Sequence, residues 1–279
     1  MKTIIIIVGV TALYILFVIV KLIKLNRRAK EIALRATQDR AMQPAEEEDT
    51  TDLHEDGTLS LHDRQYIACG ANLAYLHGDR MDTLETDSDQ EEIRGILKRE
   101  WHINTRDKLL NNIDWLVNHG HRVYFKPIWN ILTTLPVRER AAELEKLQQE
   151  FTAKGDEISV DLYASNISEG YKHLREEAGC FEGKKCKLDA LTWDLGRAIN
   201  LCRWGYDAGF LSRDEAIGHI RKYGKELLHN YTTWTNLGEN YLMGFAMWSG
   251  DLEQLDELYG AHCDLLSEDS SPWVLLESR

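Results

Sequence analysis

The sequence predicts an all-α protein, with a single N-terminal transmembrane helix followed by a compact multi-helix cytoplasmic domain. Three observations lead to this fold class. An uncharged apolar run opens the chain, helix-capping signals recur through the rest, and the 279 residues hold only four prolines. Because no alternating β-branched runs accompany these signals, helices are favoured over sheet throughout.

The apolar run at the N-terminus has the length and the flanks of a membrane anchor. Residues 4–20 carry no charged side chain, and a helix extended to Ile23 is about 30 Å long, which matches the hydrocarbon core of a bilayer. Lys2 alone precedes the run, whereas a basic collar of six Lys and Arg residues within 21–35 follows it. The positive-inside rule places this collar in the cytoplasm and the N-terminus outside.

A cleaved signal peptide fits the same segment poorly. Its apolar run would be shorter, its basic residues would come first, and a small-residue cleavage site would follow. We therefore expect residues 1–23 to span the membrane once, with lipid contacts through residues 4–23 and through the basic collar.

The segments behind the anchor differ in charge. Residues 24–43 are rich in helix formers and predict a basic helical stalk, whereas residues 44–58 are acidic, almost without apolar side chains, and predict a flexible linker. The helical domain is expected at residues 59–279. The whole chain has a net charge of −13 and residues 1–35 carry +6, which leaves −19 for the remainder. Nucleic acid is therefore not an expected partner.

Capping signals and apolar spacing place the helices of this domain. Ser60 and Ser212 begin capping-box patterns, a further helix is expected to begin at Asp89, and Asn104 is expected to cap another. Residues 122–129 are the only segment that hints at a strand. The expected helices are residues 61–76, 89–101, 105–117, 137–153, 159–177, 188–206, 213–228 and 234–250.

Cysteine and histidine spacing predicts no metal site and no cofactor. Five cysteines without paired spacing suit a reducing compartment. Cys180 and Cys186 are the only close pair, and no second Cys/His pair stands at zinc-finger spacing. His119 and His121 lie at a predicted helix end, where a histidine complements the helix dipole.

The helix expected at residues 188–206 carries two stripes. One is an ordinary core stripe of apolar residues. On the other side Trp193, Arg197, Asn200 and Trp204 follow one another at spacings of four, three and four. A helix that is apolar on one face and aromatic on the other is buried on both, which predicts a desolvated Arg197 with Asp194 as its nearest counter-charge.

Two interpretations of this polar stripe compete. In the structural one, which is favoured, Arg197 stacks on a tryptophan and pairs with an acid, a contact that contributes about 0.5–2 kcal/mol. In the functional one, Asp194 or Asp207 is a catalytic proton acceptor. The candidate ligand-binding residues are then Arg197, Asn200, Arg203 and Glu239. Arg203 and Asp207 also suit a surface ion pair one turn apart, worth about 0.3 kcal/mol.

A resemblance to a known family appears at these residues. The run from Trp193 to Ala216 and the segment 241–250 resemble the signature of the bacterial domain-of-unknown-function family 1266. Residues 101–103 and 120–122 fit the same pattern, and the likeness covers about Trp101 to Asp251. It implies a bacterial protein, and with the anchor a single-pass protein of the inner membrane. It implies no reaction.

The common catalytic signatures are missing from the sequence. There is no G-x-S-x-G elbow, P-loop, H-E-x-x-H motif or dinucleotide-binding fingerprint. We therefore expect a membrane-tethered interaction or regulatory domain that recruits a cytoplasmic protein partner with a basic face. The alternative is an enzyme or small-molecule sensor that binds an anionic ligand at the stripe of Asp194, Arg197 and Asn200. A toxin or defence effector is a third class.

Overall fold

The computed structural model describes residues 58–181 and 188–276, and all regular structure in these ranges is helical. The all-α prediction is thereby confirmed for the described domain. The expected membrane span, the stalk, Cys186 and nearly all of the acidic linker lie outside the described residues. Among the helices that are described, none combines the length and the hydropathy needed to cross a bilayer.

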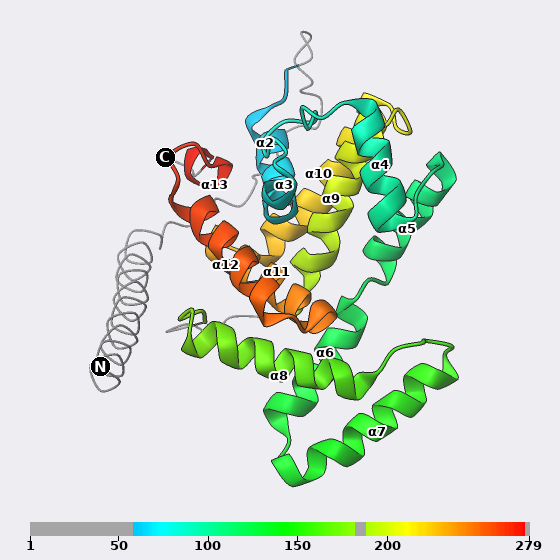
Figure 1. The fold of residues 1–279 in the computed structure, drawn as a ribbon, viewed down its shortest axis with the longest axis vertical. Helices are drawn as coiled ribbons and strands as arrows, with labels where there is room; N and C mark the ends of the chain where they lie inside the picture. The colour runs from blue at the N-terminus through cyan, green and yellow to red at the C-terminus, as the bar shows by residue number, and fades with distance from the viewer. Residues whose placement is uncertain (1–57, 182–187, 277–279) are drawn as a thin grey trace, which may run out of the picture. The chain divides into compact units, whose positions relative to one another are not determined.

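The helices follow one another along the whole described chain (Figure 1). Their bounds are α2 Leu61–Ala68, α3 Ala71–His77, α4 Gln90–Trp101, α5 Arg106–Asn118, α6 Arg122–Thr134, α7 Val137–Ala153, α8 Val160–Glu176, α9 Leu191–Asp207, α10 Arg213–Asn230, α11 Trp234–Ser249, α12 Leu252–Ser267 and α13 Pro272–Leu275.

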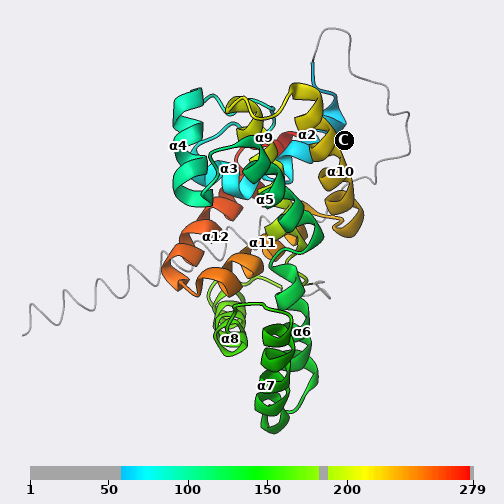
Figure 2. The same cartoon turned by 90° about the vertical axis from the view of Figure 1, so that its right-hand side faces the viewer.

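Helix α9 lies at the centre of the domain. It packs against α3, α4, α5, α10 and α11, and every residue from Leu191 to Gly205 is buried. The expectation that both of its faces are buried is therefore confirmed. Helix α8 packs on α11, and α6 and α7 extend beyond it to form the far end of the domain, as Figure 2 shows.

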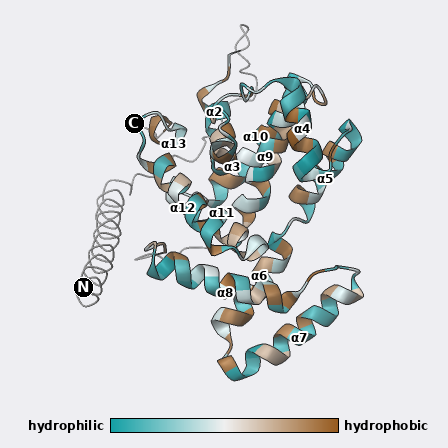
Figure 3. Ribbon diagram, in the orientation of Figure 1, coloured by the Kyte–Doolittle hydropathy of each residue, from teal (hydrophilic) through white to brown (hydrophobic). Residues whose placement is uncertain are grey.

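Two hydrophobic clusters meet along α9. One gathers apolar residues of α2, α4, α5, α10 and most of α9; the other gathers those of α6, α7, α8, α11 and α12. Trp204 belongs to the first cluster and Trp193 to the second. Around the outer helices α5 and α7, hydrophilic and hydrophobic residues alternate, as expected for helices with one solvated face (Figure 3).

Close contact between α9 and α11 depends on a glycine. A Cβ added at Gly244 would lie 2.2 Å from the Cβ of Trp193, which is far inside van der Waals contact. Only glycine at position 244 leaves room for the tryptophan of the neighbouring helix. Trp193 is thereby held against α11, where its ring meets Tyr241 edge-on at 5.1 Å between centroids.

The strand expected at residues 122–129 is wrong, because this segment forms the first part of α6. Its aromatic and β-branched residues favour a strand by local propensity. Tyr124, Phe125 and Ile128, however, share one helical face and are buried in the second cluster. Burial of that face outweighs the propensity.

Several helix boundaries also differ from the expectation. The helix expected at residues 61–76 divides into α2 and α3 at Cys69 and Gly70. At this break the side-chain amide of Asn200 donates a hydrogen bond to the Gly70 carbonyl. Helix α5 is capped by Thr105 rather than by Asn104. Helices α12 and α13, each of which buries one face, have no counterpart in the sequence prediction.

The expected capping box at Ser212 is confirmed in both directions, since Ser212 Oγ accepts from the Glu215 N–H and Glu215 Oε2 accepts from the Ser212 N–H. We expect Ser212→Ala to lower the free energy of unfolding by about 1 kcal/mol, because the first turn of α10 loses a hydrogen-bond acceptor. Urea denaturation measures the change. Ser165→Ala, at an exposed position inside α8, is the control and should be nearly neutral. Equal effects of both substitutions would contradict the assignment.

Candidate functional site

A short turn between α5 and α6 docks onto α9. Helix α5 ends at Asn118, and α6 begins at Arg122. Between them Gly120 has φ +66°, in the left-handed region. A Cβ at Gly120 would lie 2.1 Å from Asp194 Oδ2. The turn therefore needs glycine both for its backbone conformation and for the approach of a carboxylate from α9.

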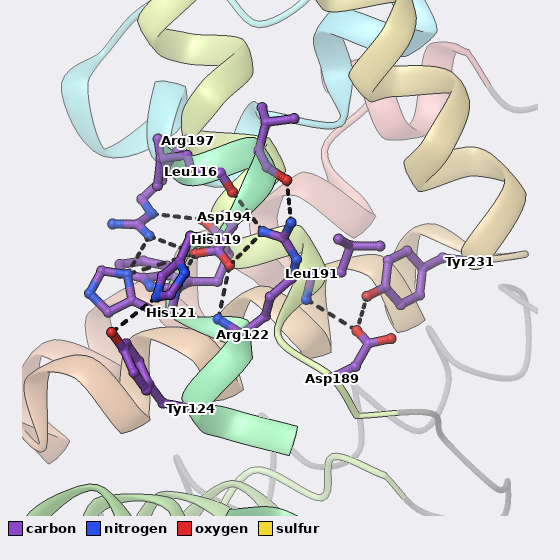
Figure 4. Close-up of polar contacts among 12 residues, drawn as sticks. Leu116, His119, His121, Arg122, Tyr124, Asp189, Leu191, Asp194, Arg197 and Tyr231 are labelled. Atoms are coloured by element: carbon purple, nitrogen blue, oxygen red, sulfur yellow. Dashed lines mark hydrogen bonds and ion pairs between the residues drawn. The ribbon is translucent and has the colours of Figure 1, made fainter. Parts of the chain in front are cut away.

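Asp194 is the centre of this contact (Figure 4). Its Oδ1 accepts from the backbone N–H of His121 at 2.9 Å and from Arg197 Nη2 at 3.0 Å. Its Oδ2 accepts from the backbone N–H of Arg122 at 2.9 Å and from Arg122 Nη1 at 3.1 Å. His121 is the N-cap of α6 and makes no side-chain cap of its own. Asp194 thus caps α6 from another helix.

The fully buried Asp194 is ionised. Burial alone would raise the pKa of this carboxyl group, but the positive charge of Arg197 and the backbone N–H groups of His121 and Arg122 outweigh burial and lower the pKa. A carboxylate with a lowered pKa and four donors is a weak proton acceptor.

Arg197 is buried between two indoles, as the structural interpretation expects. Its guanidinium carbon lies 4.0 Å from the ring centroid of Trp193 and 5.7 Å from that of Trp101. The second indole is therefore Trp101, whereas Trp204 donates from Nε1 to Asp79 Oδ2. Arg197 Nε donates to the Trp193 carbonyl at 2.7 Å. Only 7% of the arginine is exposed.

His121 is held as a neutral imidazole. Arg197 Nη2 lies 2.9 Å from His121 Nδ1, and arginine can only donate, so Nδ1 accepts and the ring proton is on Nε2. The 3.7 Å between Nδ1 and Asp194 Oδ1 is too long for a hydrogen bond. Burial lowers the pKa of His121, and the nearby charge of Arg197 lowers it further.

The neighbouring His119 belongs to a separate polar chain. His119 Nε2 lies 3.1 Å from the Tyr124 hydroxyl, which donates to Asp156 Oδ1 at 2.9 Å. Within the described ranges no three His, Cys, Asp or Glu side chains gather as metal ligands would.

Asn200 and Arg203 are committed to the protein interior. Asn200 Nδ2 donates to the carbonyls of Gly70 and Gly196, and its Oδ1 accepts from Arg203 Nη1 at 3.2 Å. Arg203 also donates to three carbonyls of the loop between α3 and α4, those of Arg80, Thr83 and Glu85. Burial lowers the pKa of Arg203 to about 10, so the guanidinium stays charged at neutral pH.

The surface ion pair suggested for Arg203 and Asp207 is wrong, because Arg203 is fully buried. Asp207 Oδ2 accepts instead from the backbone N–H and the hydroxyl of Thr86. Both side chains hold the same loop, but only Arg203 is fully buried, whereas Asp207 is partly exposed. Burial raises the pKa of Asp207, although the Thr86 hydrogen bonds oppose this shift.

The candidate catalytic and ligand-binding residues therefore do not form one site. Asp194 and Asp207 are thirteen residues apart on one helix, which separates them by about 20 Å along its axis. They cannot act on the same reacting atoms. Glu239 Oε1 accepts from the backbone N–H of Phe181, away from Asp194. A ligand-binding or catalytic role for any of them stays a prediction.

Sequence reasoning missed the residues that surround Arg197. Trp115, His121, Trp193 and Trp248 form an aromatic row, with successive ring centroids 5.1, 6.4 and 5.8 Å apart. Trp115 is 40% exposed and Trp248 50% exposed, so the row reaches the surface at both ends. The available signal was the segment Gly120–Arg122, which fits the family pattern but was interpreted as a helix end.

Comparison with known proteins gives one finding. A family model described as a protein of unknown function, DUF1266, matches residues 96–277. This range is well over half of the 279-residue chain, contains the Asp194 contacts, and extends through α12 and α13. No curated protein and no solved structure matches the chain.

Proposed function

The chain belongs to the DUF1266 family of proteins of unknown function, and from this premise we propose that it is a membrane-tethered helical domain that recruits a partner protein to the bacterial inner membrane. The observation that carries the proposal is the exposure of Trp115 and Trp248. Tryptophan is enriched among the residues that dominate binding energy at protein interfaces, and these two indoles stand at the two ends of one aromatic row.

The chemistry of the buried carboxylates supports a binding role over a catalytic one. Asp194 is ionised and surrounded by donors, and it caps α6. Asp207 accepts two hydrogen bonds from Thr86 and so holds the loop between α3 and α4. Each carboxylate thus has a structural task that accounts for its burial, which weighs against the alternative of a catalytic proton acceptor at this stripe.

The tether is supported by the sequence. The uncharged run at residues 4–20 and the basic collar that follows it suit a single span with the domain on the cytoplasmic side. The partner expected there has an apolar centre to receive the two indoles. A basic rim suits it too, since residues beyond the collar carry a strong negative charge.

Co-purification from membranes tests this proposal. The tagged full chain, the Trp115→Ala/Trp248→Ala variant and an anchor-only fragment (residues 1–58) are each extracted in mild detergent, and bound proteins are identified by mass spectrometry. We expect the full chain in the membrane fraction with a partner that the anchor alone does not retain. The double variant should retain at least tenfold less, because truncating interface hot spots costs about 2 kcal/mol or more each.

Val137→Ala is the matched control, since Val137 is the most exposed large apolar residue described and lies on α7. It should retain the partner fully. Equal recovery by the double variant and by the full chain would exclude this surface. A full chain found in the soluble fraction would exclude the tether.

A further inference from the structure

The surroundings of Arg197 contain more hydrogen-bond donors than the protein uses. Arg197 donates from Nε and Nη2, which leaves Nη1 without a hydrogen bond to any described residue. The indole N–H of Trp193 is buried and has no partner in the same part of the chain. The guanidinium carbon lies 4.0 Å from the Trp193 ring centroid, so the two side chains that carry these donors are stacked on each other.

Two phenol groups add to this donor set. Tyr163 and Tyr241 lie near enough to Arg197 to interact with its charge. Burial raises the pKa of both tyrosines, so both hydroxyls stay protonated and can donate, although the charge of Arg197 opposes the shift. Tyr241 is buried beside Trp193, whereas Tyr163 is partly exposed.

The His121 side chain lies closer to solvent than the Arg197 side chain. Its Nδ1 accepts from Arg197, so the N–H on Nε2 points to the other side of the ring (Figure 4). The side chain is 14% exposed, against 8% for the Arg197 side chain.

The charge of the cluster is also unbalanced. Arg122 and Arg197 contribute two positive charges and Asp194 one negative charge, while His121 is neutral. The cluster therefore carries a net positive charge. Arg197 is buried whereas Arg122 is partly exposed, so an anion would be favoured beside Arg197. The unpaired donors of this cluster lack hydrogen-bond acceptors, and an oxyanion supplies acceptors.

We infer that Arg197 Nη1 and Trp193 Nε1 form the floor of a binding site for a small oxyanion, a carboxylate or a phosphate group. Arginine supplies planar donors that suit both groups. The site differs from the sequence hypothesis because it excludes Asn200, whose amide is fully used inside the protein, and includes residues of the aromatic row.

Titration of the full chain in detergent with inorganic phosphate and, separately, with acetate tests the inference. Chloride at matched ionic strength is the blank, and calorimetry and thermal melting are the readouts. We expect at least one oxyanion to raise the melting temperature by about 5–10 °C at a hundredfold excess over its Kd. Whichever of phosphate and acetate binds more tightly identifies the group that the site prefers.

Trp193→Phe is the decisive variant, because it keeps an aromatic ring under Arg197 and removes the indole N–H, together with the second ring of the indole. We expect it to weaken oxyanion binding at least fivefold, and Arg197→Lys to weaken it further. Arg106→Lys, at an exposed pair with Glu215, should bind like the parent.

Two results would overturn the site: no oxyanion response beyond chloride in the parent protein, or equal affinity in the parent and in Trp193→Phe. Neither result bears on partner recruitment, which is scored by co-purification with Trp115 and Trp248 replaced.

Discussion

Asp194→Asn is expected to lower the melting temperature of the domain by roughly 10 °C. The substitution keeps the size of the side chain but removes the one carboxylate that balances Arg122 and Arg197. Removing one partner from a buried ion pair costs about 3–5 kcal/mol, because the remaining charge stays buried without compensation. The cap of α6 also loses its negative charge, which adds to the loss. Differential scanning calorimetry measures the shift.

Asp89→Asn is the matched control. Asp89 caps α4 at the exposed surface, and asparagine serves about equally well as an N-cap, so its melting temperature should stay close to that of the parent. If Asp194→Asn melted no lower than Asp89→Asn, the carboxylate would have no role in holding α6 on α9.

The parent protein and Asp194→Asn should also differ in how their stability depends on pH. The folded-state pKa of Asp194 lies below its ordinary value, so its contribution is present above the unfolded pKa of about 3.9 and is lost as the pH falls through the lower folded value. The stability difference between parent and Asp194→Asn should therefore be constant near neutrality and shrink below about pH 4. A difference that grew on acidification would have the wrong sign.

Gly120→Ala is expected to have an effect of similar size for a steric reason. Its φ of +66° disfavours any L side chain, at about 1–2 kcal/mol. The new methyl group would also meet Asp194 Oδ2 at 2.1 Å, where a buried carboxylate held by four donors has no room to move. Overpacking of this kind adds about 1–3 kcal/mol. We therefore expect a total loss of about 2–5 kcal/mol, measured by urea denaturation.

Gly155→Ala separates the two contributions. Gly155 has φ +87° and open space around the position of a Cβ, so alanine there suffers backbone strain alone. The stability lost by Gly120→Ala in excess of Gly155→Ala measures the contact with Asp194. Equal losses would mean that the turn and the carboxylate are not in tight contact.

Local signals were sufficient for most helices. Ser212 with Glu215, and Asp89, mark helix starts through hydrogen bonds within four residues, and the structure has them where the sequence predicts them. Burial of Arg197 is also predictable, because an apolar stripe on one face and two tryptophans on the other leave the helix no solvated face. The helical structure of residues 122–134 could not be predicted in this way. The strand propensity of Val123, Tyr124 and Phe125 is a local signal, whereas the packing that makes them helical is not local.

The candidate site was only half predictable for the same reason. Asp194 and Arg197 are one turn apart, so their pairing follows from spacing. The partners of Asp194 at His121 and Arg122 lie more than seventy residues away, and no spacing rule joins them. Asn200 looks like a ligand residue in the sequence, because its true partner, the Gly70 carbonyl, is a backbone atom 130 residues distant.

The cap that Asp194 places on α6 sets an order for folding. Ribosomes release the chain from its N-terminus, so α6, α7 and α8 emerge before α9 supplies the carboxylate that secures the start of α6. The last helix extends this dependence, because Trp273 Nε1 donates to the Ala68 carbonyl, 205 residues earlier. Contacts of such sequence separation form late and slow the search for the native state. A nascent chain of this protein therefore holds its early helices loosely until its C-terminal third has been made.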